Sequence, residues 1–133
     1  MAKENIGVVV SPSRSFPTDW DSHRILPGPP ISNHTLPSYL TTHGVKVGLG
    51  IQEEWAARNT RHDAAWAYAN NPEVFSKQQA IDLVSSNLEE LLGLDNEKKG
   101  LEGGWVAWEG DWFSMDARVR GVKGMGSEMV DLF

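Results

Sequence analysis

The sequence has no cysteine among its 133 residues, and it has no long apolar run. The lack of cysteine excludes disulfides and thiolate metal ligands, and it fits a reducing compartment. The apolar runs are only a few residues long, whereas a membrane-spanning helix needs about 20. The first residues, Met-Ala-Lys-Glu-Asn, include no apolar secretory segment. These features predict a cytoplasmic protein without a membrane partner.

Basic residues are scarce relative to acidic ones. There are 12 Lys and Arg against 18 Asp and Glu, which gives a formal net charge of -6. Binding to a phosphate backbone requires clustered basic residues that release counterions, so we expect no nucleic-acid partner. Apolar types make up 40% of the chain and charged types 23%, values typical of a folded globular protein.

A strand, a loop with a short helix, and a second strand open the chain. Residues 6–10 read Ile-Gly-Val-Val-Val, which is typical of a strand buried on both faces of a parallel sheet. The six prolines of residues 11–37 predict a loop over most of that stretch. Thr35 is a suitable N-cap for a short helix that ends before Gly44. Residues 45–51 then alternate apolar side chains with Lys or Gly, so the order predicts a parallel βαβ unit.

Two further helices are expected before residue 95. The first covers 57–70, with Asn59 or Thr60 as its cap, and ends before Asn71-Pro72. The second begins at a Ser-Lys-Gln-Gln capping box at residues 76–79 and keeps a 3.6-residue apolar period as one helix to Gly93.

The rest of the chain has a different pattern, rich in Gly and in short alternating segments. Strands are predicted at 105–108, 112–115, 119–122 and 129–133. We therefore expect two parts, an α/β region over 1–94 and a β-rich tail over 95–133.

The candidate site lies in the segments that follow the strands, because strand ends hold side chains rigidly in α/β folds. Glu53 is a carboxylate placed just after the second strand and is a candidate metal ligand. The alternative is structural, with Glu53 and Glu54 complementing the dipole of the helix that follows.

The remaining polar candidates have weaker patterns. The four histidines have no His-x-His or His-Glu-x-x-His spacing, and His34 is the best candidate because it lies in the long loop. Arg14 and Arg58, the latter followed by Asn59, could hold an anionic or carbonyl-bearing substrate, or they could pair with nearby acids. The six tryptophans could stack on sugars or pack in cores. Without a Gly-x-Ser-x-Gly elbow, serine hydrolase chemistry is disfavoured.

Three stretches of the sequence resemble the C-terminal third of amidohydrolase-superfamily proteins, and especially the fungal amidohydrolase-like proteins of carbohydrate esterase family nine. They are Gly7-Val8-Val9-Val10-Ser11-Pro12-Ser13-Arg14 with Arg24-Ile25-Leu26-Pro27-Gly28-Pro29-Pro30; Val45 to Trp55 with Ala57-Arg58-Asn59-Thr60-Arg61; and Ser76 to Gly93 running into Val106-Ala107-Trp108-Glu109-Gly110-Asp111.

The resemblance implies an α/β fold: the last βαβα units of a (β/α)8 metal-dependent hydrolase barrel over 1–94, and a small C-terminal β segment that joins a composite β-sandwich. It implies a divalent metal, zinc in our expectation, that activates water against a C–N or ester bond. Gln52 stands where the family has its last Asp ligand, and a carboxylate follows only at Glu53. An amide cannot act as a base.

The other family ligands lie outside the matching stretches. We therefore expect a truncated chain that is inactive by itself and binds no catalytic metal tightly. A completed barrel would act on a small-molecule substrate, with Glu53 and Gln52 as catalytic positions and Arg14, His34, Arg58 and Asn59 as substrate contacts. Exposed barrel edges would favour self-association. The alternative is a non-catalytic binding or interaction module that uses the proline-rich loop and the tryptophans.

Overall fold

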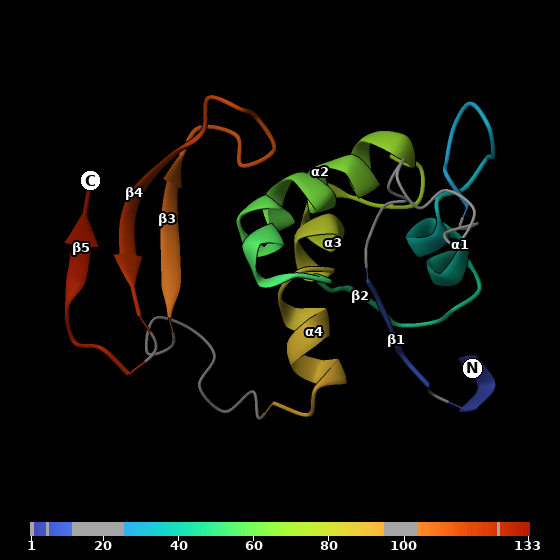
Figure 1. Cartoon of the computed structure of the whole chain (residues 1–133), viewed down its shortest axis with the longest axis horizontal. Coiled ribbons are helices and arrows are strands. Elements are labelled where there is room, and N and C mark those ends of the chain that lie inside the picture. The colour runs from blue at the N-terminus through green and yellow to red at the C-terminus, as the bar shows by residue number, and fades with distance from the viewer. Residues whose placement is uncertain (1, 5, 12–25, 95–103, 125) are drawn as a thin grey trace. The chain divides into compact units, whose positions relative to one another are not determined.

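The computed structural model describes residues 2–4, 6–11, 26–94, 104–124 and 126–133 (Figure 1). The chain divides into two units, Met1–Leu94 and Asp95–Phe133. The first unit contains η1 (Ala2–Glu4), β1 (Val8–Val10), α1 (Leu36–Thr42), β2 (Val47–Leu49), η3 (Glu54–Asn59), α2 (Thr60–Asn70), α3 (Lys77–Asp82) and α4 (Ser86–Leu91). The second contains β3 (Trp105–Glu109), β4 (Arg118–Lys123) and β5 (Val130–Leu132). None of the helices in these ranges is long and apolar enough to cross a bilayer.

The two strands of the first unit lie side by side and run parallel, as Figure 1 shows in blue and green. Val8 lies opposite Val47, and Val10 lies opposite Leu49. Backbone hydrogen bonds link the strands, including those from Val8 N to Lys46 O and from Gly50 N to Val10 O, both 2.9 Å. The parallel pairing with α1 in the connection confirms the predicted βαβ order. The structure is α/β, and a barrel remains a prediction.

The core lies against one face of this strand pair. Val10, Val47 and Leu49 are no more than 5% exposed. They are buried together with side chains from the helices and loops, namely Val45, Ala64, Ala67, Phe75, Ala80 and Leu83. Small alanines on α2 and α3 let the helix backbones come close to their neighbours.

The opposite face of the strand pair is only partly covered. Leu88 and Leu91 of α4 pack over Gly7 and Gly48, where an added Cβ would lie 1.9 Å and 2.6 Å from the leucine methyl carbons. Val9 on the same face is 44% exposed. The prediction that residues 6–10 are buried on both faces is therefore wrong, because α4 covers the glycines and leaves Val9 open.

The helix α1 begins as the sequence predicts. Thr35 adopts an extended conformation, and its Oγ1 accepts a hydrogen bond from Ser38 N at 3.4 Å. Gly44, after the helix end, has a positive φ of 74°, a conformation that glycine adopts without strain. The N-cap prediction is confirmed.

The buried amide of Asn71 ties α1 to the connection between α2 and α3. Its Oδ1 accepts hydrogen bonds from Thr35 N and Thr35 Oγ1, both at 3.1 Å. Its Nδ2 donates to Asn33 O at 2.9 Å and to Glu73 Oε1 at 3.0 Å. Asn71 is 1% exposed and Thr35 is 0% exposed, so these bonds stand in place of water. One side chain thereby fixes the loop before α1 and the turn after α2.

Truncating this amide is expected to destabilise the first unit strongly. Asn71→Ala leaves the buried N–H of Thr35 without its partner and removes three further hydrogen bonds, so it should lower the free energy of unfolding by about 3 kcal/mol. Asn70→Ala is the matched control, because Asn70 Nδ2 donates to Trp66 O alone at 2.8 Å. The control should cost about 1 kcal/mol or less in urea unfolding. Equal losses for the two variants would contradict this role.

The helix predicted over 76–93 is not continuous. Its capping box is present, with Gln79 N donating to Ser76 Oγ at 3.2 Å and Ser76 N donating to Gln79 Oε1 at 2.8 Å. The helix stops at Asp82 and resumes at Ser86, and between them Ser85 has the non-helical dihedrals φ -136° and ψ -100°. The prediction of one helix is therefore wrong, because contacts with β2, described below, interrupt the local pattern.

The other predicted helix starts later than expected. Residues 54–59 form the 3-10 helix η3, and α2 begins at Thr60. Neither predicted cap forms an N-cap bond to α2: the Asn59 side chain makes none, and Thr60 Oγ1 instead donates back to Ala57 O at 2.6 Å. The helix ends at Asn70, in agreement with the sequence.

The second unit is a three-stranded antiparallel sheet in the order β3-β4-β5. The strands predicted near 105, 119 and 129 are present. The strand predicted at 112–115 is instead a turn, in which Asp111 Oδ1 accepts from Phe113 N at 3.1 Å and Asp111 O accepts from Ser114 N at 2.8 Å. An aspartate that binds its own downstream backbone favours a turn over a strand.

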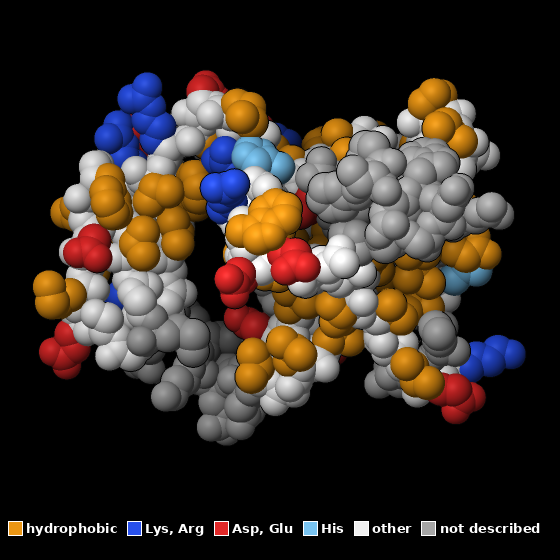
Figure 2. All heavy atoms as spheres, viewed as in Figure 1, with side chains coloured by type: hydrophobic (Ala, Val, Ile, Leu, Met, Phe, Trp, Pro, Cys, Tyr) orange, Lys and Arg blue, Asp and Glu red, His pale blue; other side chains and the backbone are white. Residues whose placement is uncertain are grey.

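Hydrophobic side chains remain at the surface of this sheet (Figure 2). The exposed ones are Val106, Met115, Met129, Val130, Leu132 and Phe133. Trp105 and Trp108 are half-buried, and the register of β3 shifts between Ala107 and Trp108. Such a shift can bring side chains three positions apart to the same side of a strand. Trp105 packs against Gly121 of β4, where an added Cβ would lie 3.4 Å from Trp105 Cζ3.

Candidate functional site at the carboxyl ends of the parallel strands

The carboxyl ends of β1 and β2 meet at one edge of the sheet. Ser11 follows β1 and Gly50 follows β2, and a Cβ placed on Gly50 would lie 2.9 Å from Val9 Cγ1 and 3.4 Å from Ser11 Cβ. Glycine at position 50 therefore permits the close approach of the two strand ends. The chain continues from this edge through Ile51 into Gln52 and Glu53, which places the two predicted catalytic residues at the end of the sheet where α/β sites form.

Gln52 and Glu53 are both exposed. Glu53 is extended, with φ -125° and ψ 142°, and its carbonyl accepts from Ala56 N at 2.9 Å to start η3. Its carboxylate makes no capping bond to that helix, while Glu54 lies in the first turn. The structural alternative, in which acids complement a helix N-terminus, therefore applies to Glu54 more directly than to Glu53.

The predicted substrate contacts are spread over separate segments. Arg58 is exposed in the last turn of η3, and Asn59 is partly buried at its end. Both lie in the segment that follows β2, downstream of Gln52 and Glu53. Arg14 lies outside the residues that the structure describes.

His34 has local contacts at the start of α1. Its Nδ1 lies 3.3 Å from Ser38 Oγ, and its ring meets Tyr39 edge-on with 6.3 Å between centroids. Its carbonyl accepts from Ser32 Oγ at 2.8 Å. These described contacts do not join His34 to Gln52 or Glu53, so its predicted role at the same site remains a prediction.

The donors at the strand ends do not by themselves fit a catalytic divalent metal. Glu53 supplies one carboxylate and Gln52 one amide oxygen. Within the described ranges, no group of three or more His, Asp or Glu side chains is arranged to hold a metal ion. Catalytic zinc sites use three protein ligands, so a metal at this edge would need ligands from other parts of a hydrolase.

A hollow bordered by α1, β2, α3 and α4 was not found from the sequence. It has a volume of about 190 Å³, and its polar lining residues are Thr41, Lys46, Gln79, Asp82 and Asn87. No local pattern indicates it, because the polar residues of 76–93 have the spacing of an ordinary solvent-facing helix surface. Asn87, one of these lining residues, also donates a hydrogen bond to the backbone of β2.

Comparison with known proteins relates the chain to amidohydrolases. A relative is Amidohydrolase tasK of Hapsidospora irregularis, which is 40% identical over 99 residues, covering 74% of this chain and 10% of that protein. This chain thus spans about a tenth of the length of the curated relative that it matches. No family model matches the chain, and no solved structure matches it. The resemblance to amidohydrolases is confirmed at this level, and the narrower resemblance to carbohydrate esterase family nine stays a prediction.

The carboxylate of Glu73 should make the stability of the first unit depend on pH. The pKa of Glu73 lies below its ordinary value of 4.5, because the backbone N–H of Glu73 and then the Asn71 amide donate to the carboxylate; desolvation opposes this, and the electrostatic effect of His34 adds the least. A lowered folded pKa means that this stabilisation is present above pH 4.5 and is lost as the pH falls through the folded value.

Glu73→Gln should therefore be less stable than the wild type above pH 4.5, and the difference should shrink in acid. Urea unfolding of both proteins on either side of that pH measures the effect. A difference that stays constant with pH would show that the carboxylate contributes no charge-dependent stability.

Proposed function

We propose that this chain supplies the last two strand-helix units and part of the β tail of a hydrolase that cleaves C–N bonds or removes acetyl groups. The observation that carries the proposal is the parallel pairing of β1 and β2, with Gln52 and Glu53 directly after the paired ends. The 40% identity to an amidohydrolase over 99 residues supports it independently.

Glu53 is the proposed catalytic carboxylate. The family's usual Asp position holds Gln52, whose amide cannot take up a proton, and Glu53 is the next side chain along. The carboxylate is exposed and does not cap η3, so it can turn toward a substrate at the strand ends. Arg58 and Asn59, with Arg14 and His34, are the proposed contacts to the substrate's carbonyl or anionic groups.

Catalysis requires more of the barrel than this chain contains. One carboxylate and one amide are too few donors for the zinc that we expect in the complete hydrolase. The isolated chain is therefore proposed to be inactive, with a small-molecule substrate bound only once the remaining strands complete the site. Whether the chain acts as part of a longer polypeptide is the first point to test.

A non-catalytic binding module is the second candidate. Trp55, next to the candidate site, is 56% exposed, and the second unit leaves several hydrophobic side chains open. Exposed indoles can stack on sugar rings. Glycan-array binding that is lost in Trp55→Ala and kept in Trp66→Ala would favour this candidate over the hydrolase.

The isolated chain should bind zinc weakly. Isothermal titration of the whole chain with zinc is expected to show no stoichiometric binding, because the described donors at the strand ends do not form a complete ligand set. Tight binding of one zinc per chain would show that this chain assembles a metal site unaided and would overturn its proposed dependence on other segments.

Transcript sequencing upstream of the region that encodes this chain tests the hydrolase directly. We expect an in-frame His-x-His after a predicted strand. In the extended protein, Glu53→Gln should lower kcat by about 100-fold or more, as expected for loss of a general base, while Glu54→Gln should change it by about threefold or less. Full activity in Glu53→Gln would remove Glu53 from the catalytic role.

A further inference from the structure

The break between α3 and α4 has one local contributor, because Ser85 Oγ donates back to Ile81 O at 2.8 Å, a bond that can bend a helix. Residues 83–87 read Leu-Val-Ser-Ser-Asn, without the Gly or Pro that usually interrupts a helix. The apolar spacing on both sides fits one helix, yet Ser85 leaves the helical region of the Ramachandran plot. The break also coincides with a tertiary contact, which the local sequence does not reveal.

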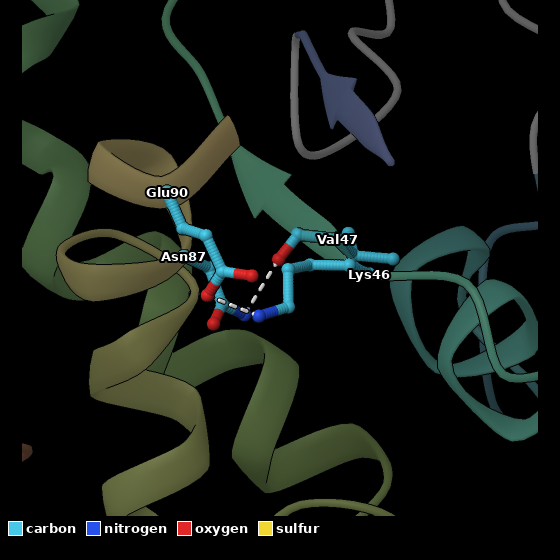
Figure 3. A network of polar contacts seen from close by, with 4 residues as sticks. All are labelled: Lys46, Val47, Asn87 and Glu90. Carbon is cyan, nitrogen blue, oxygen red and sulfur yellow. Dashed lines mark hydrogen bonds and ion pairs between the residues drawn. The ribbon is translucent and has the colours of Figure 1, made fainter. Parts of the chain in front are cut away.

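That contact is with the outer edge of β2, the edge that faces away from β1. Leu49 N donates to Leu83 O at 2.7 Å, so the Leu83 carbonyl is engaged by a strand. Asn87 Nδ2 donates to Val47 O at 2.7 Å (Figure 3). Val47 and Leu49 are each 1% exposed, so water cannot easily replace these partners.

Further contacts hold α4 in the same place. Lys46, directly before β2, forms an ion pair with Glu90 of α4 (Figure 3). Leu88 and Leu91 lie over Gly48 and Gly7, where glycine leaves space for them. The α3–α4 junction, residues 83–87, therefore occupies the hydrogen-bonding position in which a neighbouring strand would extend the sheet beyond β2.

We propose that the α3–α4 junction is a removable cap on the outer edge of β2. When the cap leaves, residues 77–91 form one helix, as their spacing favours, and the edge becomes available to another β-strand. We expect that strand to be the next strand of the barrel, and this expectation rests on the proposed function. The capped form prevents the edge from pairing with unrelated strands.

Asn87→Leu in the whole chain tests the cap, because leucine keeps a similar side-chain size and removes the donor to Val47 O. Gln78→Leu is the matched control, since Gln78 Nε2 donates within α3 to Asp82 Oδ1 at 2.9 Å and does not contact β2. Amide hydrogen exchange is followed by NMR at Leu49, which donates to the cap, and at Gly50, which donates to Val10 of β1.

Loss of the cap should speed exchange at Leu49 by about tenfold in Asn87→Leu, the change expected for one hydrogen bond, and leave Gly50 nearly unchanged. The carbon chemical shifts of residues 83–85 should move toward helical values. Unchanged exchange at Leu49, or an equal increase at Leu49 and Gly50, would overturn the proposal. Gln78→Leu should resemble the wild type at both amides.

A second variant tests the cap by favouring the continuous helix. Ser85→Ala combined with Ser86→Ala favours a continuous helix and leaves the donor of Asn87 in place. It should produce the same selective increase at Leu49, and it decides the question if Asn87→Leu does not fold. All these measurements use the chain without substrate or metal. A negative result therefore rejects the cap and says nothing about the proposed hydrolase activity. Conversely, an inactive extended protein would not argue against the cap.

Discussion

The backbone of β2 must find a hydrogen-bond partner on both of its edges, and the first unit is organised by that requirement. The strand is fully buried, so each N–H and C=O left without a partner would cost folding free energy. On one edge β1 supplies the partners in a parallel register, and on the other the Leu83 carbonyl and the Asn87 amide supply them. The core side chains and the candidate site both follow from this arrangement, because it fixes where β2 ends.

The Asn71 amide is the second constraint. It joins the loop at Asn33 and Thr35 to the connection after α2, two segments that are far apart in sequence. This link sets the start of α1, the helix that precedes β2. A parallel pair needs such a crossover, and a single buried side chain with four hydrogen bonds holds its helix in place.

Much of the fold could be predicted where the determining interactions are local. Thr35 caps α1 and Ser76 caps α3 through bonds that span three residues, so sequence spacing identifies them. The helix break at Ser85 coincides with a bond from Asn87 to Val47, which lie 40 residues apart in sequence, and no local pattern reveals that bond. Gln52 and Glu53 could be placed because they follow a strand. Asn71 and Asn87 could not, because an isolated asparagine looks the same at the surface as in a buried network.

β1 and β2 are adjacent parallel strands, and their shared carboxyl end carries Gln52 and Glu53. Scalar couplings across hydrogen bonds, measured by NMR on the labelled chain, test this pairing, because each coupling identifies one donor and one acceptor. We expect couplings from Val8 N to Lys46 C′ and from Gly50 N to Val10 C′. Couplings that pair Val8 with Leu49 and Val10 with Val47 would show an antiparallel sheet and contradict the account.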